Sequence, residues 1–177
     1  LILILLFFRG RKTFKKYNKL IDININFFVF IFLGVLITGI LTQLLKHIVG
    51  RPRPNHTNFN EDIGFNFFTF NSDFHSFPSG HTSTIFIVIL IVSYFLPKTK
   101  YFLLFFAFFV AFSRVVVGAH FITDVIGGIV MAYLGLKITK YFLDNYSFIN
   151  TDKSVAEINY ALSGKLYILI LFLFFMM

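Results

Sequence analysis

The chain has 177 residues, of which 57% are hydrophobic and only 14% are charged, and its formal net charge is +8. An average soluble domain is about half apolar and about a quarter charged, so this composition argues against one small soluble core and favours a membrane protein. The absence of cysteine excludes disulfides, thiolate metal sites and a cysteine nucleophile.

The N-terminal part of the chain divides into an apolar run and a basic stretch. Residues 1–8 are apolar and begin with Leu1 rather than methionine, and residues 9–26 are rich in lysine and arginine. A secretory signal peptide has the reverse order of charge and apolar run. We therefore predict that residues 1–8 end a truncated transmembrane helix and that residues 9–26 form a basic cytoplasmic loop.

Further apolar segments follow, separated by polar or very short links. They cover residues 27–45, 82–96, 101–117 and 121–136. A helix needs about 20 mainly apolar residues to cross the hydrocarbon core, and no alternation with a period of two supports a barrel. The sequence therefore predicts an all-α fold, a multi-pass transmembrane helical bundle with its core at residues 27–143. Residues 144–177 are expected to form a cytoplasmic segment and a truncated apolar run, which is either another span or an interfacial segment.

The longest polar loop covers residues 46–81 and is rich in Pro, Asn, His and Asp. Several phenylalanines are scattered through it, namely Phe65, Phe67, Phe68, Phe70, Phe74 and Phe77. They would either lie flat at the membrane interface or pack over a site as a lid, and both arrangements fit the sequence.

The basic residues are distributed unevenly between the two sides of the predicted bundle. If residues 9–26 face the cytoplasm, as the positive-inside rule asks, the four spans place most of the 16 lysines and arginines on that side. The cations on the opposite side are Lys46, Arg51, Arg53 and Arg114. All 5 histidines lie on that side too. Topology thus explains most of the positive charge, so we do not expect nucleic-acid binding, and the remaining cations are candidates for a function.

The first candidate segment begins at Lys46, where the first span ends, and Arg53 follows seven residues later. Pro52 and Pro54 stiffen the backbone after the helix. An arginine offers a planar fork to a phosphate, and a lysine offers a point charge. A cluster of juxtamembrane cations that snorkel to the interface is the alternative interpretation.

The second candidate segment is Pro78-Ser79-Gly80-His81, directly before the span 82–96. Ser79 is a favourable helix N-cap, and Gly80 allows backbone amides to approach an oxyanion. A helix N-terminus favours an anion through its free N–H groups and its dipole. His81 is placed to donate a proton. A capping turn with an incidental histidine is the alternative interpretation.

The third candidate segment contains Arg114, His120 and Asp124. If a helix begins near His120, the spacing of four puts His120 and Asp124 on one face. A carboxylate that holds one imidazole nitrogen leaves the other nitrogen available to attack. Buried charges are costly unless they are paired or functional, although a His–Asp pair at this spacing is often only structural. We interpret the segment as part of a phosphate-handling site at the membrane edge.

Together the three segments resemble the signature of the type 2 phosphatidic acid phosphatase (PAP2) family, which acid phosphatases and vanadium haloperoxidases share. The matching residues are Lys46, Arg53-Pro54, Pro78-Ser79-Gly80-His81, Ser113-Arg114, His120 and Asp124, without a departure from the pattern. The resemblance covers about residues 34–135.

The resemblance implies phosphomonoester hydrolysis through a phospho-histidine, without a metal or another cofactor. It implies that His120 attacks phosphorus, that Asp124 orients His120, and that His81 protonates the leaving oxygen. The groups that it implies for binding the phosphoryl oxygens are Lys46, Arg53, Arg114 and the amides near Ser79 and Gly80. A phosphoryl transition state spreads charge over its equatorial oxygens, so fixed cations suit it independently of the resemblance.

The residues away from the signature do not predict a metal site. Glu61, Asp62 and Asp73 lie in the long loop and form no evident carboxylate cluster for Mg²⁺ or Ca²⁺. The remaining histidines, His47, His56 and His75, have no familiar ligand spacing.

The position of the site at the membrane edge predicts a phosphorylated lipid as substrate. Phosphatidate, phosphatidylglycerol phosphate, an isoprenyl pyrophosphate and phosphorylated lipid A all fit, and the pair Arg51 and Arg53 would favour a polyanionic head group. We expect a multi-pass protein of a bacterial inner membrane whose site faces the periplasm and membrane lipids. The sequence leaves the particular lipid and the oligomeric state open.

Three alternative functions use the same residues differently. A lipid phosphotransferase would pass the phosphoryl group from His120 to an acceptor. A vanadium haloperoxidase fits less well because this chain is apolar enough for a membrane. An anion transporter subunit would place polar residues in mid-span, where only Thr38, Thr42 and Gln43 are candidates.

Overall fold

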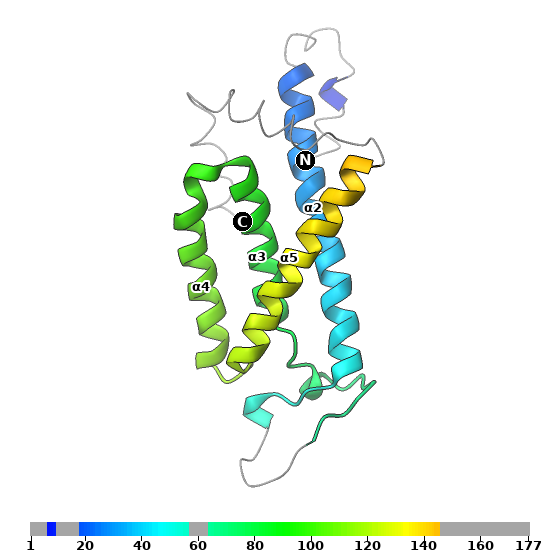
Figure 1. The fold of residues 1–177 in the computed structure, drawn as a ribbon, viewed down its shortest axis with the longest axis vertical. Coiled ribbons are helices and arrows are strands. Elements are labelled where there is room, and N and C mark those ends of the chain that lie inside the picture. The colour runs from blue at the N-terminus through cyan, green and yellow to red at the C-terminus, as the bar shows by residue number, and fades with distance from the viewer. Residues whose placement is uncertain (1–6, 10–17, 57–63, 146–177) are drawn as a thin grey trace.

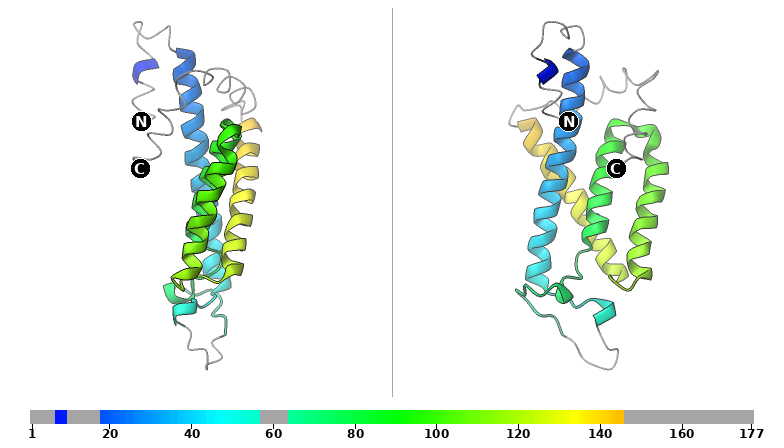
Figure 2. Two further views of the ribbon diagram at one scale, coloured as in Figure 1. Left: turned by 90° about the vertical axis from the view of Figure 1, so that its left-hand side faces the viewer. Right: turned by 180° about the vertical axis from the view of Figure 1, so that it is seen from behind.

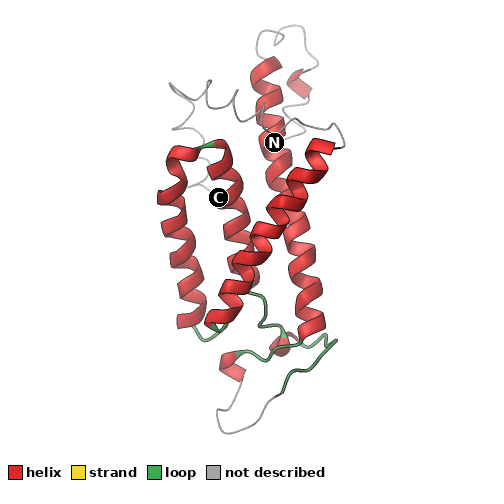
Figure 3. Cartoon of the chain, in the orientation of Figure 1, coloured by secondary structure: helices red, strands yellow, loops and turns green. Residues whose placement is uncertain are grey.

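The computed structural model describes residues 7–9, 18–56 and 64–145. Its long helices are α2 (Asn18–Val49), α3 (Gly80–Phe95), α4 (Lys100–Val116) and α5 (Ile122–Asn145). Short 3₁₀ turns lie between them, namely η2 (Pro54–His56), η3 (Ser72–Phe74) and η4 (Pro97–Thr99). The described residues contain no strand (Figure 3), which confirms the all-α fold class. The predictions for residues 1–8 and 144–177 fall almost entirely outside the described residues.

Helix α2 turns one face into the bundle and the opposite face away from it. The buried positions recur every four residues, at Phe30, Gly34, Thr38, Thr42 and Lys46. The exposed apolar positions also recur every four residues, at Phe32, Leu36, Ile40, Leu44 and Ile48. Side chains four residues apart lie on the same face of a helix. Lys46 therefore points inward because it continues the buried stripe.

Helix α3 lies at the centre of the bundle and packs against α2, α4 and α5. It is apolar on all sides, which is typical of a helix that is surrounded by others. Its 16 residues give a length of about 24 Å, shorter than the hydrocarbon core of about 30 Å. The described helices that are long and apolar enough to cross a membrane are Asn24–Val49, Pro97–Val116 and Ile122–Asn145. The short central helix is thus shielded by the longer ones.

Two helices extend beyond the apolar runs that predicted them. Helix α2 begins at Asn18, so residues 18–26, which were predicted to be loop, are helical. Helix α5 continues to Asn145, past the predicted end at residue 136. A bilayer favours apolar residues only across its hydrocarbon thickness. The apolar run therefore indicates the part of a helix within the membrane and not the ends of the helix.

Glycines let α5 approach the rest of the bundle closely. A Cβ atom on Gly128 would lie 2.7 Å from the backbone oxygen of Ser79, and one on Gly135 would lie 1.9 Å from Oγ1 of Thr38. Small residues of this kind allow backbones of membrane helices to come close together. The contact at Gly128 brings the start of α5 against the start of α3.

The chain changes direction at each connection, so the three candidate segments meet at one end of the bundle. The C-terminal ends of α2 and α4 and the N-terminal ends of α3 and α5 all lie at the lower end in Figure 1. Figure 2 shows the same arrangement from two other sides, with the long loop at that end.

The phenylalanines of the long loop do not form one group. Four of them, Phe65, Phe67, Phe68 and Phe70, are exposed, and none of these lines the cavity described below. Phe77 packs instead against Gly127, where an added Cβ would lie 2.5 Å from the ring. The exposed four thus do not form a lid, which favours the interfacial arrangement.

Candidate active site

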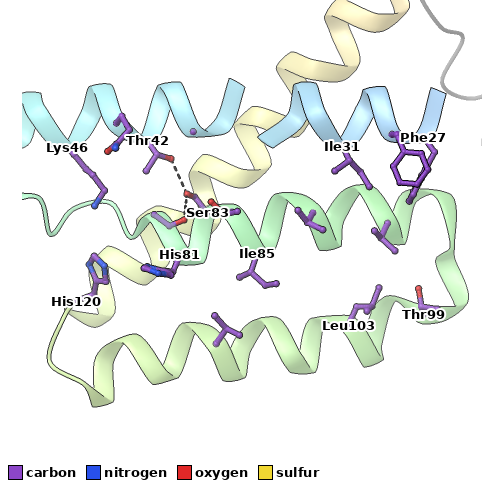
Figure 4. A pocket seen from close by; sticks show the side chains of 18 of the residues that line it. Phe27, Ile31, Thr42, Lys46, His81, Ser83, Ile85, Thr99, Leu103 and His120 are labelled. Atoms are coloured by element: carbon purple, nitrogen blue, oxygen red, sulfur yellow. Dashed lines mark hydrogen bonds between the residues drawn. The ribbon is translucent and has the colours of Figure 1, made fainter. Parts of the chain in front are cut away.

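A cavity of about 1000 Å³ begins at the end of the bundle where the candidate segments meet and runs along α3. Its polar end is lined by Lys46, Arg53, His81 and His120. Figure 4 shows the ammonium group of Lys46 and the rings of His81 and His120 pointing toward one another. Apolar side chains of α2, α3 and α4 line the remainder, including Phe27, Ile31, Ile85 and Leu103. The site thus has a cationic end and a long apolar extension.

Asp124 lies behind His120, and its side chain is 0% exposed. Its Oδ1 accepts a hydrogen bond from Nη1 of Arg51 at 2.6 Å. Its Oδ2 accepts one from Oγ of Ser76 at 2.5 Å and one from the backbone N–H of Phe121 at 2.8 Å. The last contact is the reach-back of a third helical residue to the residue before the helix, as in a capping box. The local start of α5 therefore fixes the carboxylate.

His120 is 3% exposed, and its Nδ1 lies 3.7 Å from Oδ2 of Asp124. This distance is too long for a direct hydrogen bond, and no other described group pairs with Nδ1. An approach of about 0.8 Å would complete the bond at the usual length. The arrangement places a carboxylate against one ring nitrogen while the ring itself borders the cavity.

A tight helix ending holds His120 in place. The backbone N–H groups of Ala119 and His120 both donate to the carbonyl of Arg114 at 3.2 Å. Gly118 has φ of +69°, the left-handed conformation that commonly ends a helix and that glycine adopts most easily. The carbonyl of Gly118 also accepts from the N–H of Asn55 at 3.0 Å. The loop that carries His120 is thus tied to the first candidate segment.

Lys46 and Arg53 are each anchored by one bond to the long loop. Nζ of Lys46 donates to the carbonyl of His75 at 2.6 Å, and Nε of Arg53 donates to the carbonyl of Ser72 at 3.0 Å. A lysine has three donor hydrogens and an arginine has five. Both side chains therefore keep donors for a ligand in the cavity.

Ser79 acts within the protein and not in the cavity. Its hydroxyl accepts from the N–H of Thr82 at 3.5 Å as the N-cap of α3. Its own N–H donates to the backbone carbonyl of Asp124 at 2.9 Å, so the Ser79 amide is occupied. Gly80 and His81 line the cavity, so their amides are the candidates of this segment for contact with a ligand.

Arg114 lies in the last turn of α4, where its Nε donates to Oγ of Ser113 at 3.2 Å. It does not line the cavity. Its charge nevertheless acts on His81: the pKa of the His81 ring is lowered from its usual value, first by burial and then by Arg114, with Lys46 and Arg53 contributing less. The positive charges predicted from the sequence therefore converge on His81.

Two residues of the site were not predicted from the sequence in their actual role. Arg51 was predicted to favour a polyanionic lipid head group. Its guanidinium instead pairs with Asp124 and does not line the cavity. Both arginines precede proline, which favours extended backbone, but residues two apart in extended backbone share a face, so this pattern did not separate their roles. Ser76 is fully buried, and nothing in its aperiodic loop marked it.

No group of three His, Asp or Glu side chains among the described residues could hold a metal ion. Glu61 and Asp62 lie outside the described residues.

Comparison with known proteins finds bacterial relatives that share about a third of the aligned residues with this chain. The chain is 34% identical over 131 residues to a lipid A 1-phosphatase of Rhizobium johnstonii, covering 71% of this chain and 54% of the relative. It is 32% identical over 133 residues to a lipid A 1-phosphatase of Rhizobium etli, covering 72% and 57%. It is 32% identical over 114 residues to a phosphatidylglycerophosphatase B of Bacillus subtilis, covering 58% and 51%. The chain thus spans about half the length of the curated relatives it matches, and no solved structure matches it.

The family comparison agrees with the resemblance seen in the motifs. The model of the PAP2 superfamily matches residues 27–147, which are more than half of the chain and contain all three candidate segments. The chain therefore belongs to the PAP2 superfamily.

Proposed function

We propose that this chain hydrolyses a phosphate ester or pyrophosphate on a membrane lipid, through a phospho-histidine formed on His120. The observation that supports the proposal most directly is the shape of the cavity. Its cationic end suits a phosphate, and its apolar extension along α3 suits a lipid chain. The names of the relatives, a lipid A 1-phosphatase and a phosphatidylglycerophosphatase B, point to the same class of substrate.

In the first step, the lone pair on Nε2 of His120 attacks phosphorus. Asp124 faces Nδ1, and once the 3.7 Å separation closes by about 0.8 Å it accepts the Nδ1 hydrogen bond, which keeps the proton on that nitrogen and leaves Nε2 as the nucleophile. The bond from phosphorus to the lipid oxygen breaks, and His81 gives its proton to that oxygen. In the second step, water attacks the phosphorus of the phospho-histidine while His81 accepts a proton from the water. Inorganic phosphate leaves, and both histidines return to their starting states.

The cations stabilise the charge on the phosphoryl oxygens as these steps proceed. Phosphoryl transfer is mainly accelerated by positioning and by electrostatic stabilisation of the equatorial oxygens. Lys46 and Arg53 line the cavity and Arg114 acts from beside it. Because the nearby wall is apolar, fixed charges act there more strongly than they would in water.

The placement of charged groups favours an enzyme over an anion transporter. The segments that carry the charged residues of the site all lie at one end of the bundle (Figure 1). The buried polar residues of α2 at mid-span, Thr38 and Thr42, are uncharged. Thr42 donates a hydrogen bond from its Oγ1 to Oγ of Ser83 at 3.2 Å. A transport pathway would place stronger polar groups along its length.

The orientation follows from the basic residues. The positive-inside rule places the N-terminal end of α2 in the cytoplasm, so the site faces the opposite side, which is the periplasm in a bacterial inner membrane. A lipid with its chains in the hydrocarbon would then reach the site by lateral diffusion.

The test is release of inorganic phosphate by the purified protein in detergent micelles. Phosphatidylglycerol phosphate, phosphatidate, an isoprenyl pyrophosphate and lipid A are compared with water-soluble phosphate esters. We expect release from one or more lipids without an added acceptor, and a loss of at least about 10⁴-fold in His120→Ala. His47→Ala is the matched control, because His47 lies at the same end of the bundle but does not line the cavity.

Three outcomes would contradict parts of the proposal. Near-normal activity in His120→Ala would remove the assignment of the nucleophile. Activity on soluble esters alone would remove the lipid substrate. Release only in the presence of an acceptor lipid would identify a phosphotransferase.

A further inference from the structure

We propose that Arg51 is a positioning residue for the reaction: it holds the Asp124 carboxylate charged and oriented toward His120 and does not bind the substrate phosphate. This inference rests on the proposed function, in which Asp124 supports His120 as the nucleophile.

The side-chain contacts of Arg51 are all with residues at the start of α5 or just before it. Its Nη1 donates to Oδ1 of Asp124 and to Oγ1 of Thr123, both at 2.6 Å. Its guanidinium carbon lies 4.2 Å from the centre of the Phe121 ring. Its side chain is 23% exposed, while that of Asp124 is 0% exposed. Arg51 is therefore held against three of the four residues that follow His120, namely Phe121, Thr123 and Asp124.

The contacts divide the two carboxylate oxygens between two tasks. Oδ1 receives Arg51, and Oδ2 receives Ser76 and the N–H of Phe121 and faces Nδ1 of His120. A carboxylate bound at Oδ1 cannot rotate about its terminal bond without losing the ion pair. Arg51 therefore keeps Oδ2 on the side of His120.

The charge of Arg51 also helps to keep Asp124 ionised, together with the hydrogen bonds from Ser76 and the N–H of Phe121. A buried carboxylate without a cation partner tends to take up a proton, because charge is costly away from water. A protonated Asp124 would be a poorer acceptor for the Nδ1 proton. It would also allow the wrong tautomer of His120, with the proton on the attacking nitrogen.

Arg51 does not share the task of its near neighbour Arg53. Lys46 and Arg53 line the cavity, whereas Arg51 and Asp124 do not. Lys46 and Arg53 would meet a phosphate in the cavity, and the Arg51 side chain is bonded to Thr123 and Asp124 instead. Loss of Arg51 should therefore slow the chemical step without weakening the binding of an anion.

The test compares Arg51→Gln with Arg53→Gln, its matched control two residues away. Turnover is measured as phosphate release from phosphatidylglycerol phosphate in micelles, and anion binding is measured as inhibition by orthovanadate. We expect Arg51→Gln to lower kcat by about 10²-fold and to leave the vanadate inhibition constant within about threefold of the wild type. We expect Arg53→Gln to raise the vanadate inhibition constant by about tenfold or more.

A double-mutant cycle separates positioning from a general loss of structure. If Arg51 acts through Asp124, adding Arg51→Gln to Asp124→Asn should cost less than about threefold in residual turnover. If Arg51→Gln only damaged the folded structure, it would lower turnover by the same factor in Asp124→Asn as in the wild type. If Arg51→Gln does not accumulate as a folded protein, Arg51→Lys is measured in its place. Arg51→Lys keeps the charge and is expected to show a kcat below that of the wild type with an unchanged vanadate inhibition constant.

Two results would overturn the inference. Arg51→Gln could weaken vanadate inhibition as much as Arg53→Gln does, which would assign Arg51 to the phosphate. It could also retain full kcat, which would leave Arg51 without a part in the reaction. Either result, with an inactive His120→Ala, overturns only the role of Arg51, whereas an active His120→Ala overturns the proposed function itself.

Discussion

The two sides of His120 are built in opposite ways. On the closed side, both carboxylate oxygens of Asp124 are occupied by Arg51, Ser76 and the start of α5. On the open side, His81 is exposed and Lys46 and Arg53 each give one bond to the protein and keep the rest of their donors. Groups that must be in place before a substrate arrives are bonded to the protein, and groups that meet the substrate keep unused donors. This difference suits preorganised electrostatic catalysis.

Removal of the charge on the closed side should have the largest effect. Asp124→Asn keeps the shape of the side chain but removes the negative charge, leaves Arg51 without its partner and no longer selects the tautomer of His120. We expect kcat for phosphate release to fall by roughly 10³-fold or more. Thermal unfolding in detergent serves as the control for folding, because an unpaired buried arginine also destabilises the protein. A variant that keeps a tenth of the kcat would show that the closed side is not needed for turnover.

Removal of the proposed proton donor on the open side, His81, should have an effect that depends on the leaving group. We expect His81→Asn to lower turnover of a lipid phosphate by about 10²-fold or somewhat more, because a lipid alkoxide needs a proton in order to leave. Release of p-nitrophenol from p-nitrophenyl phosphate in the first turnover should fall by much less, since this leaving group is stable as an anion. Rapid-quench measurements of the first turnover compare the two substrates. An equal loss on both would assign His81 to phosphate binding.

The helical part of the site is predicted from the sequence better than the part that the loop supplies. Lys46 and Asp124 continue the buried stripes of α2 and α5, so helical period alone indicates their direction. His120 follows from its spacing to Asp124. Ser79 is correctly expected as an N-cap because that role depends only on local chemistry.

The unpredicted part of the site comes from the loop between α2 and α3. Arg51 and Ser76 lie in aperiodic backbone, and the direction of each side chain is set by contacts with the start of α5, more than forty residues later in the chain. The loop itself is closed by the bond from the N–H of Ser76 to the carbonyl of Arg51 at 3.0 Å. Such contacts between distant segments leave no periodic pattern in the sequence. The same limit applies to helix ends, because α5 continues to Asn145 after its apolar run has finished.

The smallest expected effect comes from one hydrogen bond on the closed side. Ser76→Ala removes the donor that lies 2.5 Å from Oδ2 of Asp124, but Arg51 and the N–H of Phe121 still hold the carboxylate. A hydrogen bond to a charged group contributes about 1.5–3 kcal/mol, and only part of that should reach the reaction through His120. We therefore expect kcat to fall by about three- to tenfold with an unchanged vanadate inhibition constant. Ser72→Ala, at an exposed position of the same loop, should leave kcat unchanged. A loss in Ser76→Ala as large as that in Asp124→Asn would mean that Ser76, and not the ion pair with Arg51, holds the carboxylate in place.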